Sequence, residues 1–550
     1  MSRELFSFNG GVHPPEHKTE SNTRPIHPPA LPKRLVIPLR QHIGTQAKPI
    51  VAVGERVLKG QMIAAAEGAI SAAIHASSSG TVRAIDLQAV PHASGLPDLC
   101  ISIETDGLDE WGPRTPLDYR ACAPDELRAR LRDLGLVGLG GAVFPSAIKL
   151  DARTENGCPT LILNGGECEP WITCDDVLMR HHASEILQGL AVMQHLLNSR
   201  EILVGIEDNK PEAIAAMQAA TATLDYAVEV IAVPTRYPSG GGKQLIKMLT
   251  GLEVPSGKLS TDIGIQVFNI GTAYALYRAV FLGEPLISRV VTVTGHVLRP
   301  QNIEALIGTS MMTLIQAAGE RDGRSGLLMG GPMMGVTLPT DEVPVVKATN
   351  CVLVQTAELF PPLPRALPCI RCTRCADACP ADLQPQELFR FAKSDDFDRA
   401  QAYHLFDCIE CGCCNYVCPS HIPLVDFYRY AKREIGARAQ DKQAADLARE
   451  RHEFRLFRLA REKAEKAEKL VARAQAQRAA STVNPDPEAD TKRALIAAAL
   501  ARAQARKTDA APRNTEHLPT HAQQQVEESE ARRAQLNAIT PAPSPQKENR

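Results

Sequence analysis

The sequence of 550 residues lacks several features that would direct a chain into a membrane or onto nucleic acid. No stretch approaches the roughly 18 consecutive apolar residues that a membrane-spanning helix needs. Residues 1–30 mix prolines, histidines and charges without an apolar centre, so we expect no signal peptide. The net charge of −2 gives no overall attraction to nucleic acid or to an acidic membrane. We therefore expect a cytoplasmic chain, in which thiols stay reduced and disulfides are rare.

Cysteine, by contrast, is abundant and unevenly placed. Nine of the fifteen cysteines fall in two short runs, residues 369–380 (CIRCTRCADACP) and 408–419 (CIECGCCNYVCP). Both runs have the spacing C-x2-C-x2-C-x3-C-P. Three thiolates at this spacing can hold three corners of a [4Fe–4S] cluster, while the fourth, before the proline, reaches the other cluster in two-cluster ferredoxins. The spacing predicts two [4Fe–4S] clusters and a chain that carries electrons.

This pattern assigns ligands across the two runs. One cluster takes three cysteines of one run and the last cysteine of the other, giving Cys369, Cys372, Cys375 and Cys418 for one cluster and Cys408, Cys411, Cys414 and Cys379 for the other. A pair of zinc sites is the alternative, but structural zinc uses four ligands per unit and shows no closing C-P. Cys413, inside the second run, is expected to be a bystander.

The central part of the chain opens with a glycine-rich segment, residues 135–149 (GLVGLGGAVFPSAIK). Its glycines suit a loop whose backbone N–H groups approach a phosphate at a helix start, and SAIK reads as that helix. A glycine-rich loop alone is a weak sign, because many such loops are only tight turns.

Strands and helices alternate after this loop. An apolar run from Thr160 to Leu163 ends in Asn164 and is followed by Glu167 and Glu169. Residues 200–220 (REILVGIEDNKPEAIAAMQAA) and 230–246 (VIAVPTRYPSGGGKQLI) each read as a strand, a turn and a helix. This alternation predicts an α/β domain with ligands at the carboxyl ends of its strands.

Three of these segments, GLGGAVFPSAIK, NGGECEP and VFNIGT, resemble the flavin loops of the NADH-binding flavoprotein subunit of respiratory complex I. In that family the loops surround FMN, and the acidic segment also lies beside the nicotinamide. The resemblance implies an FMN site formed by Gly138, Gly140, Gly141, Lys149, Asn164, Glu167, Asn269 and Thr272. It also implies that Phe144 and Glu169 face the nicotinamide of NAD(H).

Some positions depart from that family's pattern. Leu139 replaces a basic residue, Val143 replaces a glycine, and Gly241 and Gly242 stand where the family has two acids. A glycine-rich backbone can still hold a phosphate, so we expect FMN. A fold that has kept its shape but lost its flavin is the alternative.

Over residues 6–435 the chain resembles still more closely the C-subunit family of Rnf-type (Rsx) electron-transport complexes. The shared segments run in order from FNGGVHPPEHK through GIEDNKP and GGPMMG to both cysteine runs. The resemblance implies a peripheral subunit on the cytoplasmic face of the bacterial inner membrane, a translocase-type oxidoreductase active only within its complex. Implied partners are the integral membrane and flavoprotein subunits, NAD(H), and ferredoxin or another redox protein; no nucleic acid is expected.

The expected fold class is multidomain α/β and β. We predict an arm (1–30), a barrel-sandwich hybrid (31–115), a flavoprotein-like α/β domain (116–287), an SLBB β-grasp domain (288–348), a ferredoxin-like dicluster domain (349–432), charged helices (433–510) and a disordered tail (511–550). The hairpin tip AAEGAIS of the first β domain has no lysine, so swinging-arm chemistry is not expected. The helix from about residue 430 could dock a membrane or a partner, or simply face solvent.

Function is therefore expected to be electron transfer, without a catalytic acid or base. One hypothesis passes electrons from NADH through FMN to the two clusters. A second is a flavin-free iron–sulfur docking subunit that relays electrons between other proteins, and a third is a soluble hydrogenase or diaphorase subunit. Flavin content and NADH oxidation separate the first two.

Overall fold

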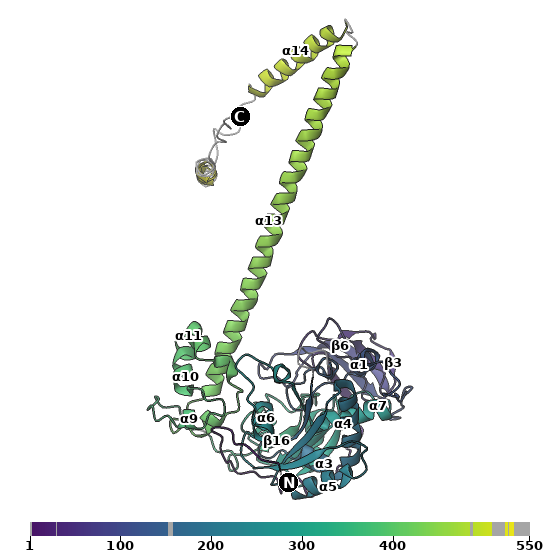
Figure 1. Cartoon of the computed structure of the whole chain (residues 1–550), viewed down its shortest axis with the longest axis vertical. Helices are drawn as coiled ribbons and strands as arrows, with labels where there is room; N and C mark the ends of the chain where they lie inside the picture. The colour runs from purple at the N-terminus through teal and green to yellow at the C-terminus, as the bar shows by residue number, and fades with distance from the viewer. Residues whose placement is uncertain are drawn as a thin grey trace. The chain divides into compact units, whose positions relative to one another are not determined.

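The computed structural model describes residues 3–28, 30–151, 158–362, 364–483, 488–508, 523–525 and 527–532 (Figure 1). The chain divides into two compact units, Met1–Ala439 and Gln440–Arg550. All four sheets of the described residues belong to the first unit.

The first β domain consists of two small sheets. One has the strand order β1-β7-β6-β3 and the other β2-β4-β5. The strands are β1 Arg34–Pro38, β2 Lys48–Pro49, β3 Arg56–Val57, β4 Met62–Ala65, β5 Ile74–His75, β6 Gly80–Gln88 and β7 Asp98–Thr105. Alternate residues such as Leu35, Ile37, Ile101 and Ile103 are fully buried and form the core between the sheets.

The second sheet system is parallel and has the order β10-β9-β8-β11. Its strands are β8 Thr160–Gly165, β9 Glu201–Glu207, β10 Glu229–Val233 and β11 Ile265–Asn269. Its helices are α1 Pro124–Asp133, α2 Ser146–Lys149, α3 Cys174–His181, α4 Ala183–Leu197, α5 Pro211–Thr221, α6 Gly242–Thr250 and α7 Ile270–Phe281, with the 3-10 turn η1 Ser260–Ile263. The expected alternation of strands and helices is present.

Both faces of this parallel sheet are covered, as its apolar strands require. One face packs against α3, α4, α5 and α7, and the other against α6 together with Phe8 from the N-terminal arm. Pro211 begins α5, where its missing N–H costs no hydrogen bond. Because all four strands are parallel, their carboxyl ends lie at the same edge of the sheet.

A five-stranded sheet of order β13-β12-β16-β14-β15 follows. Its elements are β12 Ser288–Gly295, β13 Gln301–Leu306, α8 Met311–Ala318, β14 Gly326–Met329, β15 Val336–Thr337 and β16 Cys351–Gln355. Helix α8 packs its buried Leu314 and Ile315 on the sheet, and Ser310 caps it by accepting the Thr313 N–H.

The two cysteine runs lie in a small helical domain with its own core. It contains α9 Arg374–Asp377, α10 Pro385–Lys393, α11 Phe397–Ala402, the 3-10 turn η2 Leu405–Asp407, α12 Cys413–Tyr416 and the first part of α13 Leu424–Val483. Leu388, Phe391, Leu405 and Tyr428 form the centre, and the Tyr428 hydroxyl donates to the Pro385 carbonyl at 2.7 Å.

The second unit holds the rest of α13 and α14 Ala489–Thr508, in agreement with the two predicted helices. Large apolar side chains such as Phe454 and Phe457 are exposed on α13. Across the described ranges, no helix combines the length and the hydropathy that a membrane crossing demands. Of the tail predicted to be disordered, only 523–525 and 527–532 are described, and both segments are helical; the remainder lies outside the described residues.

The N-terminal arm binds the parallel-sheet domain to the cysteine domain. The Phe6 N–H donates to the Met248 carbonyl at 3.0 Å, and the Gly11 N–H donates to the Ala378 carbonyl at 3.0 Å. Val12 forms an antiparallel bridge with Tyr237. The arm is thus a structural clamp within the first unit.

Lys347 joins three parts of the first unit. It is 1% exposed, and its Nζ donates to the carbonyls of Ala73 (3.2 Å) and Gly135 (2.6 Å). Its backbone N–H donates to Gln41 Oε1 at 3.0 Å. Burial without a nearby anion lowers the pKa of Lys347 to about 7, because the charged amine loses its hydration.

This pKa predicts a pH-dependent stability. Between pH 7 and the usual lysine value of 10.5, the unfolded chain holds a proton that folded Lys347 has released, so the free energy of unfolding should rise with pH. Lys347→Met removes this titration. In denaturant unfolding, the free energy of unfolding of the parent should rise relative to that of the variant by up to about 1.4 kcal/mol per pH unit. If the difference between the two free energies did not change with pH, folded Lys347 would keep its charge.

Candidate functional site

The carboxyl edge of the parallel sheet brings together four of the predicted flavin residues. Asn164 at the end of β8 pairs in register with Asn269 at the end of β11. A Cβ built on Gly140 would lie 3.2 Å from the Asn269 Cβ, so the glycine loop passes directly over this edge. The Leu139 N–H donates to Thr272 Oγ1 at 2.9 Å, which anchors the loop to the start of α7.

The glycine loop itself is a tight reversal. The Gly138 N–H donates to the Phe144 carbonyl at 2.8 Å, and Val137 bridges Pro145 beneath it. Gly141 has a φ of +102° and a Cβ there would meet open space, so the loop presents bare backbone at its tip. Val143 has a φ of +42°, a conformation that strains a β-branched residue.

A second loop contact forms between Asn164 and the segment that starts α6. Asn164 Nδ2 donates to the Gly240 carbonyl at 2.9 Å, and its Oδ1 accepts the Gly166 N–H at 2.9 Å. A Cβ on Gly242 would meet nothing within 4 Å. Of the two glycines at the positions of the acids, Gly242 therefore leaves space at this edge, whereas a Cβ on Gly241 would lie 2.3 Å from Gln244 Oε1.

Glu167 serves the start of α3. Its Oε1 accepts the Asp175 N–H at 2.8 Å, and its Oε2 accepts the Asp176 N–H at 3.3 Å. A carboxylate at this position satisfies unpaired N–H groups and interacts favourably with the helix dipole. The side-chain oxygen and sulfur atoms of Glu167, Cys174 and Asp175 that could ligate a metal lie within 4.8 Å of one another. The hydrogen bonds of Glu167 to the start of α3 account for this grouping.

Asp175 links this helix start to the sheet edge. Asn269 Nδ2 donates to Asp175 Oδ2 at 2.6 Å. Burial, with the nearby Glu167 charge second, raises the pKa of Asp175 to about 7. Among the described residues, Asn269 Oδ1 is buried and has no hydrogen-bond partner. The unpartnered acceptor, the bare glycine backbone and the open space at Gly242 fit a bound group with hydrogen-bond donors and a phosphate, as FMN has.

Lys149 contacts β11 near the carboxyl edge of the sheet. Its Nζ donates to the Val267 carbonyl and lies 4.5 Å from the centre of the Phe268 ring. Burial lowers the pKa of Lys149 to about 8. Phe144 is half-buried in the glycine loop.

Glu169 holds a distant loop. Its Oε1 accepts the N–H groups of Met333 (2.7 Å) and Met334 (3.0 Å), which belong to the GGPMMG segment between β14 and β15. Burial raises the pKa of Glu169 above its usual value, while these N–H donors act in the opposite direction. Glu169 therefore connects the parallel-sheet domain to the five-stranded sheet.

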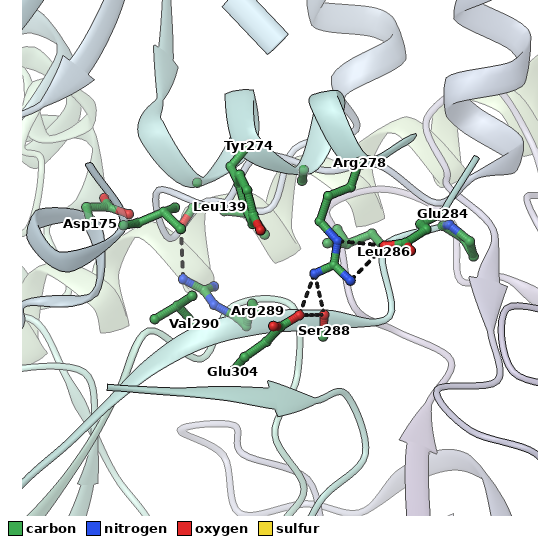
Figure 2. Close-up of a pocket in the computed structure, with 14 residues that line it drawn as sticks. Leu139, Asp175, Tyr274, Arg278, Glu284, Leu286, Ser288, Arg289, Val290 and Glu304 are labelled. Carbon is green, nitrogen blue, oxygen red and sulfur yellow. Dashed lines mark hydrogen bonds and ion pairs between the residues drawn. The ribbon is translucent and has the colours of Figure 1, made fainter. Parts of the chain in front are cut away.

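A pocket lined by Leu139 of the glycine loop lies between α7 and strands β12 and β13 (Figure 2). Arg278 descends from α7 and pairs with Glu284 and Glu304 (Figure 2). Arg289 reaches from β12 toward the loop, where its Nη2 donates to the Leu139 carbonyl at 3.4 Å. Burial lowers the pKa of Arg289.

The cysteine runs surround two further cavities. One, which we call the second-run cavity, is lined by Cys379, Cys408, Cys411 and Cys414, and Cys413 also lies in its wall. The other, the first-run cavity, is lined by Cys369, Cys372, Cys375 and Cys418. Each therefore collects three cysteines of one run and the last of the other. Four sulfur donors around a compact, largely apolar space suit an iron–sulfur cluster.

Two residues of the site carry no sequence signal. Lys18 Nζ is buried and donates to the carbonyls of Glu167 (2.7 Å), Glu169 (3.0 Å) and Ile172 (2.7 Å). The Tyr237 hydroxyl donates to the Cys411 carbonyl at 2.6 Å. Both contacts join segments more than a hundred residues apart, so local patterns could not reveal them.

Four family models match the chain. They are the RnfC barrel sandwich hybrid domain (residues 6–108), the Nuo51 FMN-binding domain (131–278), the SLBB domain (290–337) and the 4Fe-4S dicluster domain (368–422). These matches confirm the predicted fold class and the predicted FMN and [4Fe–4S] cofactors.

Curated relatives are described as the C subunit of an ion-translocating oxidoreductase complex. The relative from Klebsiella pneumoniae is 44% identical over 550 residues, covering 98% of this chain and 71% of its own. Those from Edwardsiella ictaluri (49%) and Pseudomonas aeruginosa (50%) cover 73% of this chain and 50% and 52% of their own lengths. The chain thus spans about half the length of these two relatives. A chain of an NAD+-reducing [NiFe]-hydrogenase in the H2-reduced state matches with a TM-score of 0.42 and 20% identity, over 57% of this chain and 63% of that one.

The two hydrogen bonds of Glu169 predict that its carboxylate protects the backbone of the GGPMMG loop from exchange. Glu169→Ala leaves two N–H groups without their acceptor, so amide exchange at Met333 and Met334 should speed by roughly tenfold or more. Hydrogen exchange with mass spectrometry checks this. Glu169→Gln keeps a side-chain oxygen and is the matched control, expected to exchange nearly like the parent. Equal protection in both variants would show that other contacts hold the loop.

Proposed function

The chain belongs to the C-subunit family of ion-translocating oxidoreductase complexes, and we propose that it passes electrons between NAD(H) and membrane partners. The route runs through an FMN site at the carboxyl edge of the parallel sheet and then through two [4Fe–4S] clusters. The observation that carries the proposal is the presence, in one compact unit, of two four-cysteine cavities beside a flavoprotein-type sheet edge.

The protein's part in this chemistry is to bind, orient and exclude water. FMN, when bound, takes two electrons from NADH and releases them singly, and each iron–sulfur cluster carries one. The backbone of residues 138–141, with Asn164, Asn269 and Thr272, would hold the flavin. Lys149, Glu167 and Glu169 each bind backbone groups of the surrounding segments, so we propose that they hold those segments in place around the site, with Phe144 and Glu169 on the nicotinamide side.

The cysteine sets are proposed as the cluster ligands in their crossed arrangement. Support comes from the two cavities, whose walls hold the sets that the sequence spacing predicts. Cys413 shares one cavity wall but is buried against Val12, Tyr237 and Ala378 instead of standing at a spacing position. We assign it no iron.

Partners and location follow from the family. We propose attachment to integral membrane and flavoprotein subunits at the cytoplasmic face of the bacterial inner membrane, with ferredoxin or another redox protein as an exchange partner. The family membership and the reduced-thiol chemistry of the clusters support this. The protein would act as an oxidoreductase only within that ion-translocating complex.

Cofactor counting tests the proposal. Anaerobically purified protein should contain about eight irons and about one FMN per chain, and NADH should bleach its visible spectrum. Eight irons without flavin and without an NADH response would favour the flavin-free docking role. Full reduction by dithionite in the same sample serves as the control that the clusters are competent.

Double substitutions test the crossed ligands. Cys379→Ser with Cys408→Ser should remove one cluster and leave about four irons, because both residues line one cavity. Cys379→Ser with Cys369→Ser should remove both clusters. Cys413→Ser is the control and should keep about eight irons. If the two double variants gave the opposite iron counts, each run would hold its own cluster.

A further inference from the structure

The two cysteine cavities differ in what surrounds them. The second-run cavity abuts the rest of the first unit on several sides. The Tyr237 hydroxyl donates to the Cys411 carbonyl, and a Cβ on Gly412 would lie 2.6 Å from the Met333 carbonyl oxygen. Gln244 Nε2 donates to the Pro380 carbonyl at 3.5 Å. Three separate segments of the sheet domains thus reach this cavity.

The first-run cavity faces outward. Every residue that lines it lies between Cys369 and Leu424, so no upstream segment of the described chain contributes to its wall. Cys369 and Cys372 are exposed, and Ile370 between them is 67% exposed. The cysteines of the first-run cavity are therefore more accessible to a partner than those of the second-run cavity, of which Cys379, Cys411 and Cys414 are buried and Cys408 is half-buried.

Tyr237 provides a short connection from the flavin edge to the second-run cavity. Its ring is 3% exposed and packs with Ala378, Cys411 and Cys413. Its backbone is fixed by the bridge to Val12. Three residues later, the Gly240 carbonyl accepts the Asn164 Nδ2–H at the sheet edge. Two hydrogen bonds and four residues of backbone therefore join Asn164 to Cys411.

We infer that Tyr237 is a positioning residue for the second-run cluster, and that this cluster is the one next to the flavin. The first-run cluster is then the one that exchanges electrons with a one-electron partner. Each NADH oxidised to NAD+ yields two electrons and one proton; the electrons leave singly in this order, and the proton goes to solvent. The inference rests on the proposed function.

The hydroxyl acts through the Cys411 main chain. A donor on the Cys411 carbonyl withdraws negative charge from the loop that carries a ligand, which favours the reduced cluster with its extra electron. Without it, the buried carbonyl has lost its partner and the reduction potential of this cluster should fall. The first-run cluster, whose lining residues do not include Tyr237, should keep its potential.

The test is a redox titration of the full chain with dithionite and mediators, followed by electron paramagnetic resonance. The titration needs the clusters but neither flavin nor NADH, so its outcome is independent of the FMN count and the NADH response above. Tyr237→Phe should lower the potential of one signal only, the signal that Cys379→Ser abolishes, with iron content unchanged.

Tyr416→Phe is the matched control. Tyr416 lies in α12 beside the same cavity but is 51% exposed, so both potentials should stay as in the parent. Unchanged potentials in Tyr237→Phe, or a shift in the other signal, would overturn the inference.

A second measurement tests the order in the unaltered protein. An aqueous paramagnetic ion should shorten the relaxation of the first-run signal more than that of the second-run signal, because Cys369 and Cys372 are exposed whereas the cysteines of the second-run set are buried or half-buried. Equal relaxation of the two signals would contradict the order even if Tyr237→Phe lost its cluster.

Discussion

One buried ammonium group organises the site. Lys18 Nζ donates to three carbonyls of the turn that carries Glu167 and Glu169, and burial lowers its pKa. Removing a cation from water is costly unless its donors are satisfied, and here all three are. With the turn fixed, Glu167 can cap α3 and Glu169 can hold the GGPMMG loop against the second-run cavity. The N-terminal arm that brings Lys18 also bridges Tyr237.

The charged side chains at the flavin edge come from different positions than in the complex I flavoprotein pattern. The glycine loop has Leu139 where that family carries a basic residue, and Arg289 donates to the Leu139 carbonyl from β12. The cation therefore comes from the five-stranded sheet and lies behind the loop. Glu167 and Asp175 face each other at the start of α3, which contributes, after burial, to the raised pKa of Asp175. Charge at this edge depends on contacts between domains.

Features that depend on short sequence patterns could be predicted from the sequence, whereas contacts between distant segments could not. The C-x2-C-x2-C-x3-C-P runs predicted which cysteines line each cavity, because three of each set are neighbours on one tight loop and the two-cluster ferredoxin pattern supplies the fourth from the other run. The strand end at Asn164 also followed from its apolar run, whereas Asn269 was predicted only from the resemblance of VFNIGT to a flavin loop. Lys149 donating beneath β11, and Glu167 and Glu169 serving backbone N–H groups, could not be predicted, because their partners come from other segments. The strained φ of Val143 likewise follows from the fold around the loop.

The interleaving of the two cysteine runs has a consequence for assembly. Since each cavity needs residues from both runs, neither half of the domain can complete a metal-binding wall by itself. If the crossed sets are the ligands, iron bound in one cavity would preorganise the fourth sulfur of the other, which would couple the maturation of the pair. The intervening segment, with α10, α11 and η2, acts as a spacer whose fold sets the register of both. An insertion or deletion in that spacer would therefore disturb two metal centres at once.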